Sequence, residues 1–309
     1  MGNEANPEVV GNSRHADAEI GALPQAPGSV VHTGDPCHLY YRHALAVRIM
    51  HWVNVIAVTI LFMSGLNIFS AHPALYWGKS SYTGKGPVFQ ITSHQTDENE
   101  LVGVTRLFGR EFVTTGLLGA TAGADGATVA RTFPSWVTLP DDRWLSMARR
   151  WHFFFAWVFV INGLCYLAYS IASRHLSRDL APTVADWRSV GRSVVDHLRF
   201  RHPTGEAAKR YNVLQKLAYL GVIFVLFPLL VLMGFAMSPW LDSAIPGWVD
   251  LFGGRQSART LHFIFAWLLV AFASIHVFEV IVSGFFNHMR SMITGRYRID
   301  LGVRNEKTR

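Results

Sequence analysis

The sequence predicts an all-α integral membrane protein whose core is a four-helix transmembrane bundle. The 309-residue chain is 50% hydrophobic and only 16% charged, whereas soluble proteins are about 25% charged. Four stretches contain no Asp, Glu, Lys or Arg, and each approaches the roughly 20 apolar residues that cross a bilayer. These stretches are Ile49–Gly78, Trp151–Ser173, Leu217–Leu241 and Thr260–Phe278.

The four stretches define one membrane domain, 41–290. A polar amino-terminal tail, 1–40, precedes this domain, and a basic tail, 291–309, follows it. The first tail contains no basic segment that leads into a short apolar stretch, so we expect no cleavable signal peptide. The four helices are expected over about 45–70, 150–172, 214–238 and 260–285.

The distribution of positive charge predicts the orientation of the bundle. The net charge is +7, and 18 of the 28 Lys and Arg residues lie in the segments that share one side of the membrane with the amino terminus. Nine of them lie in the loop 174–216, whereas the loop 239–258 has one. By the positive-inside rule, both termini are cytoplasmic and the insert 71–148 is periplasmic. We therefore expect a multi-pass protein of a bacterial inner membrane, and no nucleic-acid partner.

The second and fourth apolar stretches repeat one sequence pattern. Arg149–Trp157 and Arg259–Trp267 both follow Arg-x-x-His-Phe-x-Phe-Ala-Trp, and Arg48–Trp52 is a shorter version. Three helices therefore begin with an Arg that stands three residues before a His, one turn away on the same face.

Four histidines lie in the apolar stretches: His51, His152, His262 and His276. The last two are 14 residues apart, which is about 1400° of helix, some 40° short of four full turns. They share one face and stand about 21 Å apart along the axis. One helix thus offers a ligand near each membrane surface.

Depth in the membrane allows only two pairings of these histidines. His51 and His276 are both near the inner surface, and His152 and His262 are both near the outer surface. Two imidazoles fill both axial positions of a haem iron, an arrangement suited to electron transfer. The chain has no CxxCH attachment motif, so we expect two non-covalent b-type haems. A proton relay or another metal is the alternative.

Three arginines and two glycines are further candidates for contact with the cofactors. Arg48, Arg149 and Arg259 lie about one turn nearer the surface than a histidine, where they can pair with haem propionates or extend to the membrane surface. Gly65 and Gly163 leave room either for a macrocycle or for close helix packing.

Glu279 is the one acid near the inner end of the fourth helix, three residues past His276. A carboxylate at this place can exchange protons with a quinone beside the inner haem. The other interpretation is a solvated charge at the helix end, paired with Arg290.

The loop 173–212 is expected to contain an amphipathic basic helix. Thr183-x-x-Asp186 resembles a capping box, and Val184, Trp187, Val190, Val194 and Leu198 follow helical spacing among arginines. This helix either lies in the inner leaflet or packs on the ends of the bundle.

These motifs resemble a known family of membrane proteins. Arg48-x-x-His51-Trp52, Arg149–Trp157 and the His262…His276 helix are similar to the dihaem cytochrome b subunits of formate dehydrogenases, nickel–iron hydrogenases and thiosulfate reductases. The outer segments His72–Gly78 and Arg150–Trp157 place the resemblance nearest the thiosulfate-reductase-type group. The resemblance spans about 40–300.

The resemblance implies a membrane anchor that transfers electrons between a periplasmic catalytic subunit, often a molybdopterin enzyme, and the quinone pool of the respiratory chain. It assigns the ligand roles to His51, His152, His262 and His276. An alternative is a stand-alone membrane oxidoreductase that acts on a small redox molecule at its periplasmic face. A non-redox transporter, with the histidines as a proton path, is a third class.

Overall fold

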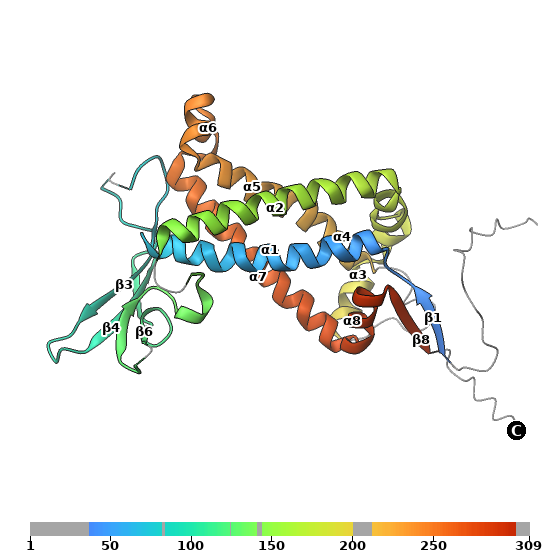
Figure 1. Cartoon of the computed structure of the whole chain (residues 1–309), viewed down its shortest axis with the longest axis horizontal. Helices are drawn as coiled ribbons and strands as arrows, with labels where there is room; N and C mark the ends of the chain where they lie inside the picture. Colours follow the sequence, from blue (N-terminus) through green and yellow to red (C-terminus); the bar gives the residue numbers. More distant parts are fainter. Residues whose placement is uncertain (1–36, 82–83, 124, 141–143, 200–211, 301–309) are drawn as a thin grey trace, which may run out of the picture.

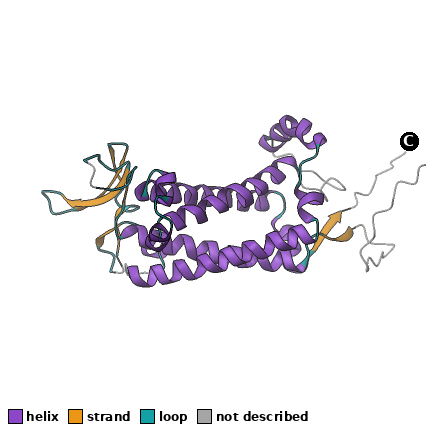
Figure 2. Cartoon of the chain, turned by 90° about the horizontal axis from the view of Figure 1, so that it is seen from above, coloured by secondary structure: helices purple, strands orange, loops and turns teal. Residues whose placement is uncertain are grey.

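The structure, a computed structural model, describes residues 37–81, 84–123, 125–140, 144–199 and 212–300. Most of these residues are helical. The helices form a long bundle with a strand-rich insert at one end and a two-stranded ribbon at the other (Figures 1 and 2). The expected tail 1–40 lies mostly outside the described residues, as does the end of the expected tail 291–309.

Among the described residues, four helical segments are long and apolar enough to cross a membrane. The third consists of two α-helices joined by a π-helical turn, η4. α2 and α7 begin about one turn before their expected starts. The uncharged stretches exclude Arg149 and Arg259, whereas both residues lie inside the helices. The bounds are α1 Leu45–Ser70, α2 Leu145–Ala172, α4 Val213–Gly221, η4 Val222–Leu226, α5 Phe227–Ala236 and α7 Arg255–Val282.

Pro228 accounts for the irregular turn in the third segment. Proline has no backbone N–H, and its ring clashes with the carbonyl four residues before it, so a regular helix cannot continue through it. The π-helical turn ends at Leu226, and Pro228 falls in the first turn of α5, where proline is tolerated.

The bundle is built from two closely packed helix pairs, α1 with α2 and α5 with α7. Between α1 and α2, the buried amide of Asn162 donates to the carbonyl of Met50 at 2.9 Å and to Oδ1 of Asn54 at 2.7 Å. Such interhelical hydrogen bonds stabilise helix contacts in lipid, where no hydrophobic force drives association. Large apolar side chains such as Phe154 and Leu164 are exposed, as expected for a surface that faces acyl chains.

The insert between α1 and α2 is folded mainly as strands, so the expectation of an all-α chain is wrong here. Its strands contain many Thr and Val residues, and all of them except the two-residue strand Ala74–Leu75 lie outside the apolar stretches. Their backbone groups are satisfied by strand pairing instead of by a helix. A four-stranded antiparallel sheet has the order β2-β3-β4-β5, and β6 pairs with β7. The bounds are β2 Ala74–Leu75, β3 Phe89–Gln95, β4 Leu101–Leu107, β5 Arg110–Val113, β6 Gly119–Ala122 and β7 Thr128–Arg131.

A buried aromatic cluster fixes the insert to the bundle. Phe89 of β3 lies 5.6 Å from Phe263 of α7, and Phe263 lies 4.8 Å from Phe69 at the end of α1, between ring centres. Phe133 completes the cluster on the side of the insert. The insert therefore sits against the ends of α1 and α7 that are nearest to His152 and His262.

The opposite end of the bundle carries the antiparallel ribbon of β1 and β8, in which Tyr40 lies opposite Tyr297. Helix α8 leads into this ribbon, and α3 lies at the same end (Figure 1). The remaining bounds are β1 Cys37–Tyr41, β8 Arg296–Asp300, η1 Ser135–Val137, η2 Leu176–Leu180, α3 Val184–Leu198, α6 Pro239–Ala244, η5 Trp248–Phe252 and α8 Phe285–Thr294.

Candidate metal centres

The first candidate site lies between α1 and α7, at the end of the bundle that carries the β1–β8 ribbon. His51 projects from the second turn of α1, and His276 projects from the last two turns of α7. Their ring centres are 6.3 Å apart, and the ring planes meet at 70°.

The second candidate site lies between α2 and α7, at the end that carries the insert. His152 and His262 project from the early turns of their helices. Their ring centres are also 6.3 Å apart, and their planes meet at 67°. One face of α7 therefore serves both sites, and α1 and α2 each complete one of them.

The separation of the rings fits one metal atom held between two imidazoles. A ligating imidazole nitrogen lies about 2 Å from its metal, and the ring centre lies about 1 Å further. Two imidazoles on opposite sides of one metal therefore have centres about 6 Å apart, in agreement with both pairs. Within the described ranges, no group of three or more His, Cys, Asp or Glu residues forms a metal site, which disfavours a tetrahedral zinc centre there.

Backbone carbonyls orient both rings of the second pair. Nδ1 of His152 lies 3.1 Å from the carbonyl oxygen of Leu61, and Nδ1 of His262 lies 3.0 Å from that of Leu230. A carbonyl oxygen can only accept, so each Nδ1 carries the proton and Nε2 is left for a metal. The buried hydroxyl of Ser64 also lies 3.1 Å from Nδ1 of His152.

A glycine makes each of these carbonyls accessible. Gly65 and Gly234 stand four residues after Leu61 and Leu230, and a helical side chain covers the turn that precedes it. A Cβ built on Gly65 would lie 3.4 Å from Cε1 of His152, and one on Gly234 would lie 3.7 Å from Cε1 of His262. The absence of a larger side chain therefore leaves each imidazole room beside its carbonyl.

The first pair has no such support among the described residues. Aromatic side chains surround it instead: the ring of Phe272 stacks on His276 at 6.1 Å, and Trp52 lies edge-on to His51 at 5.6 Å. The indole of Trp52 donates to the carbonyl of Met292 in α8 at 3.2 Å. The rings of this pair are positioned by packing.

The three candidate arginines have different surroundings. Arg259 donates to the carbonyls of Ala74 and His72, which joins α7 to the start of the insert. Arg48 donates to the carbonyl of Ile293 in α8. The guanidinium of Arg149 lies 5.9 Å from the ring centre of Phe153. Arg48 and Arg259 therefore join neighbouring segments at opposite ends of the bundle. A guanidinium has five N–H donors, so each has donors left for an anion.

Gly163 and Glu279 lie at separate places. A Cβ on Gly163 would meet no atom within 4 Å, so α2 is open at this point. Glu279 is half-buried near the end of α7, and its backbone carbonyl accepts from the hydroxyl of Ser283.

Two histidines at the margins of the spans are shifted toward the neutral form. Burial, followed by the neighbouring Arg42, lowers the pKa of His43 to about 4. Burial and the charge of Arg259 lower the pKa of His72. His43 is therefore uncharged at neutral pH, and the neutral form of His72 is favoured.

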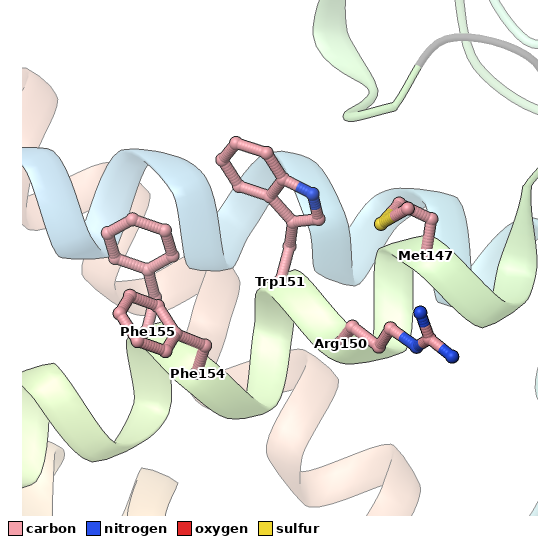
Figure 3. Close-up of a pocket in the computed structure, with 5 residues that line it drawn as sticks. All are labelled: Met147, Arg150, Trp151, Phe154 and Phe155. Atoms are coloured by element: carbon pink, nitrogen blue, oxygen red, sulfur yellow. The ribbon is translucent and has the colours of Figure 1, made fainter.

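A shallow apolar hollow on α2 does not belong to either site. It is lined by Met147, Arg150, Trp151, Phe154 and Phe155 (Figure 3). Its aromatic side chains are exposed or half-buried, and none of the four histidines lines the hollow. This composition is typical of a lipid-facing surface rather than of a reaction site.

Comparison with known proteins identifies the family of this chain. Residues 42–295 match the family of prokaryotic cytochrome b561. The chain belongs to this family. It is therefore a haem-containing, electron-transferring b-type cytochrome of a prokaryotic membrane.

Two relatives illustrate the range of this family. The chain is 27% identical over 239 residues to a putative protein-methionine-sulfoxide reductase subunit, YedZ1, from Azospira oryzae, covering 77% of this chain and 89% of the relative. It is 24% identical over 262 residues to a probable Ni/Fe-hydrogenase B-type cytochrome subunit from Cupriavidus necator, covering 81% and 82%. No solved structure matches the chain significantly.

Sequence reasoning missed the residues that surround the second pair. The sequence interpretation gives Gly65 as room for a macrocycle or as a place of close helix packing, and it does not include Ser64 or Gly234. The signal was present for Ser64, a polar residue beside a glycine in an apolar helix. Gly234 lies in the one span that lacks a histidine, so only the fold connects it with His262.

Proposed function

We propose that this cytochrome transfers electrons across the membrane between a periplasmic oxidoreductase subunit and the quinone pool. One observation carries the proposal: a single helix, α7, supplies one histidine to each of two pairs that lie near opposite ends of the bundle. Two redox sites at different depths suit passage of electrons from one membrane surface to the other.

In this proposal each histidine pair holds one b-type haem through Nε2. Haem would supply one-electron chemistry when bound, and the two imidazoles of each pair would hold it. The backbone carbonyls of Leu61 and Leu230 keep the outer imidazoles in the required tautomer. Arg48, Arg149 and Arg259 are the candidate partners of the propionates, and the open positions at Gly65 and Gly163 are candidate space for the macrocycles.

The proposed orientation places the insert in the periplasm and both termini in the cytoplasm. The concentration of Lys and Arg in the loop 174–216 and after 287 supports it. His152 and His262 are then the outer pair, and His51 and His276 are the inner pair. The membrane is the bacterial inner membrane, and the domain limits 1–40, 41–290 and 291–309 belong to this proposal.

The proposed partner is a periplasmic catalytic subunit that docks on or beside the insert. Both relatives are named as subunits of larger oxidoreductases, which supports a partner. The outer-loop motifs that resemble the thiosulfate-reductase-type group favour a molybdopterin enzyme. The insert also supports a docking partner, because it is a folded structure that is fixed to one end of the bundle.

The proposed quinone site lies at the inner pair, near Glu279. This end is the far one from the periplasmic partner, and quinone reduction requires protons as well as electrons. Glu279 stands one turn past His276 and is half-buried, so its carboxylate can act as a proton-transfer group.

Two measurements test the proposal. Pyridine haemochrome analysis of the purified protein should give two non-covalent haems per chain, and one or none would refute the dihaem assignment. Cysteines placed at exposed Gln95 and Ser177 should label oppositely with an impermeant thiol reagent in cells with a permeabilised outer membrane. Labelling of Ser177→Cys alone would reverse the orientation.

A further inference from the structure

Helix α3 is attached to the bundle through its polar side. The carboxylate of Asp186 accepts from the backbone N–H of Thr183 at 2.8 Å and from Nζ of Lys216 in α4 at 2.9 Å. These two donors, the backbone N–H first, hold the pKa of Asp186 below its usual range. The half-buried residues of α3 that follow on this side are Ser189, Val190 and Ser193.

The opposite side of α3 presents an exposed apolar stripe. At about 100° per residue, Val184, Trp187, Val194 and Val195 fall within roughly one third of the helix circumference. Their exposed fractions are 68%, 59%, 39% and 45%. Packing against the bundle therefore does not explain why this side is apolar, because α3 contacts the bundle through its opposite, polar side.

Arginines border the apolar stripe. Arg188 and Arg192 are exposed, and neither forms an ion pair or hydrogen bond with any residue that the structure describes. Arg199 lies on the same border, at about 20° from Arg188 when viewed along the axis. Positive charge beside an exposed Trp and three Val residues is typical of helices that lie at a lipid surface.

The position of α3 brings this surface to the membrane. It follows α2 after the short turn η2, and it packs against α4, where the third span begins. Figure 1 shows α3 at the end of the bundle that also carries α8 and the β1–β8 ribbon. The helix is therefore held where the membrane spans leave the bilayer.

We propose that the stripe of Val184, Trp187, Val194 and Val195 enters the lipid interface, while Arg188, Arg192 and Arg199 bind anionic lipid headgroups. An exposed apolar stripe bordered by Arg188 and Arg192, which have no ion-pair partner among the described residues, matches the boundary between acyl chains and headgroups. This surface is independent of the haem sites and of the direction of electron flow.

The first test measures the environment of the stripe. A spin label is placed at Val194→Cys in full-length protein with Cys37 and Cys165 changed to Ser, in nanodiscs of phosphatidylcholine with phosphatidylglycerol. The label should collide readily with oxygen, which partitions into lipid, and poorly with a water-soluble nickel chelate. Ready collision with the chelate would place the stripe in water, and poor collision with both reagents would place it under protein; either result overturns the proposal.

The second test measures the preference for anionic lipid. Arg188→Gln/Arg192→Gln should lower the retained phosphatidylglycerol, relative to phosphatidylcholine, by about tenfold in native mass spectrometry, because each basic residue near a membrane contributes several-fold to binding. The control is Lys85→Gln/Arg110→Gln, which removes the same charge from exposed positions of the insert. Equal lipid retention by the two variants would refute the role of the arginines.

Discussion

The two histidine pairs, which are the outer and the inner pair in the proposed orientation, have the same ring separation and nearly the same ring angle. They differ in the groups that hold the rings. His152 and His262 are each held by a backbone carbonyl, whereas His51 and His276 are positioned by aromatic neighbours within the described structure. An imidazole that donates from Nδ1 to a carbonyl is a stronger electron donor through Nε2. We therefore expect the outer pair to favour ferric iron more strongly than the inner pair.

The two pairs also differ in whether an acidic residue lies nearby. The outer pair has fixed imidazoles and no acidic residue nearby in α7, whereas the inner pair has looser support and Glu279 one turn away. In the proposed function, the outer site would therefore transfer electrons alone, and the inner site would transfer electrons together with protons. The following variants test this division.

The largest expected effect is the loss of one haem. His152→Ala and His262→Ala should each reduce the haem content from two to one and remove the same component of the reduced-minus-oxidised spectrum. His51→Ala and His276→Ala should remove the other component, because each variant leaves an axial position unfilled. Loss of one and the same component from His51→Ala and His152→Ala would contradict the pairing.

The next effect concerns the inner pair alone. Glu279→Gln keeps the shape of the side chain and removes its charge, so both haems should still bind. Electron exchange with a quinol analogue should slow by about 10²-fold if the carboxylate transfers the proton. Stopped-flow absorbance at a wavelength specific to the inner haem measures this rate. An unchanged rate would leave Glu279 as a solvated charge.

The outer pair should respond to the size of residue 234. In Gly234→Val, the methyl groups extend beyond a Cβ that already contacts His262, so the imidazole should be pushed from the carbonyl of Leu230. We expect the midpoint potential of the outer haem to rise, or that haem to be lost, with the inner haem unchanged. Gly234→Ala should be milder, because its Cβ makes only an ordinary contact.

Gly221→Val is the matched control for this series. Gly221 lies in the same transmembrane segment, and a Cβ there meets no atom within 4 Å. Redox titration followed by visible absorbance compares the variants. If Gly221→Val and Gly234→Val shift the outer potential equally, the shift comes from a larger side chain anywhere in this segment and not from crowding of the His262 ring.

The smallest effect is expected for Ser64→Ala. Its hydroxyl is a second contact of His152 beside the carbonyl of Leu61, and one hydrogen bond contributes about 1 kcal/mol. For a one-electron couple this corresponds to a rise of roughly 40 mV in the outer potential. Thr59→Ala, which removes a hydroxyl from α1 that bonds only within its own helix, should leave the potential unchanged.

The four spans were predictable because lipid imposes a strong constraint on sequence. An uncharged stretch of the required length is sufficient evidence, so α1 was expected over 45–70 and is observed at Leu45–Ser70. The depth of each histidine in the membrane also predicts the two pairs that the structure brings together. Their role as haem ligands stays a prediction.

The insert and the surroundings of the outer pair were not predictable in the same way. The strands of the insert are short, and Phe89 joins Phe263 only through long-range packing. The acceptors for His152 and His262 are main-chain atoms, which every residue type provides. A sequence therefore shows a glycine in a span, but it does not show which backbone carbonyl accepts the hydrogen bond from a histidine ring.

Helix α7 has a consequence for how this chain can change during evolution. It runs without interruption from Arg255 to Val282 and carries both His262 and His276. Substitutions between them leave the spacing intact, but the insertion of one residue would turn His276 by about 100° and move it about 1.5 Å along the axis. Such a change would remove one ligand from its partner while leaving the helix equally apolar. We therefore expect the length of this segment to vary less among related chains than its composition, and insertions to be confined to the insert and to the loops.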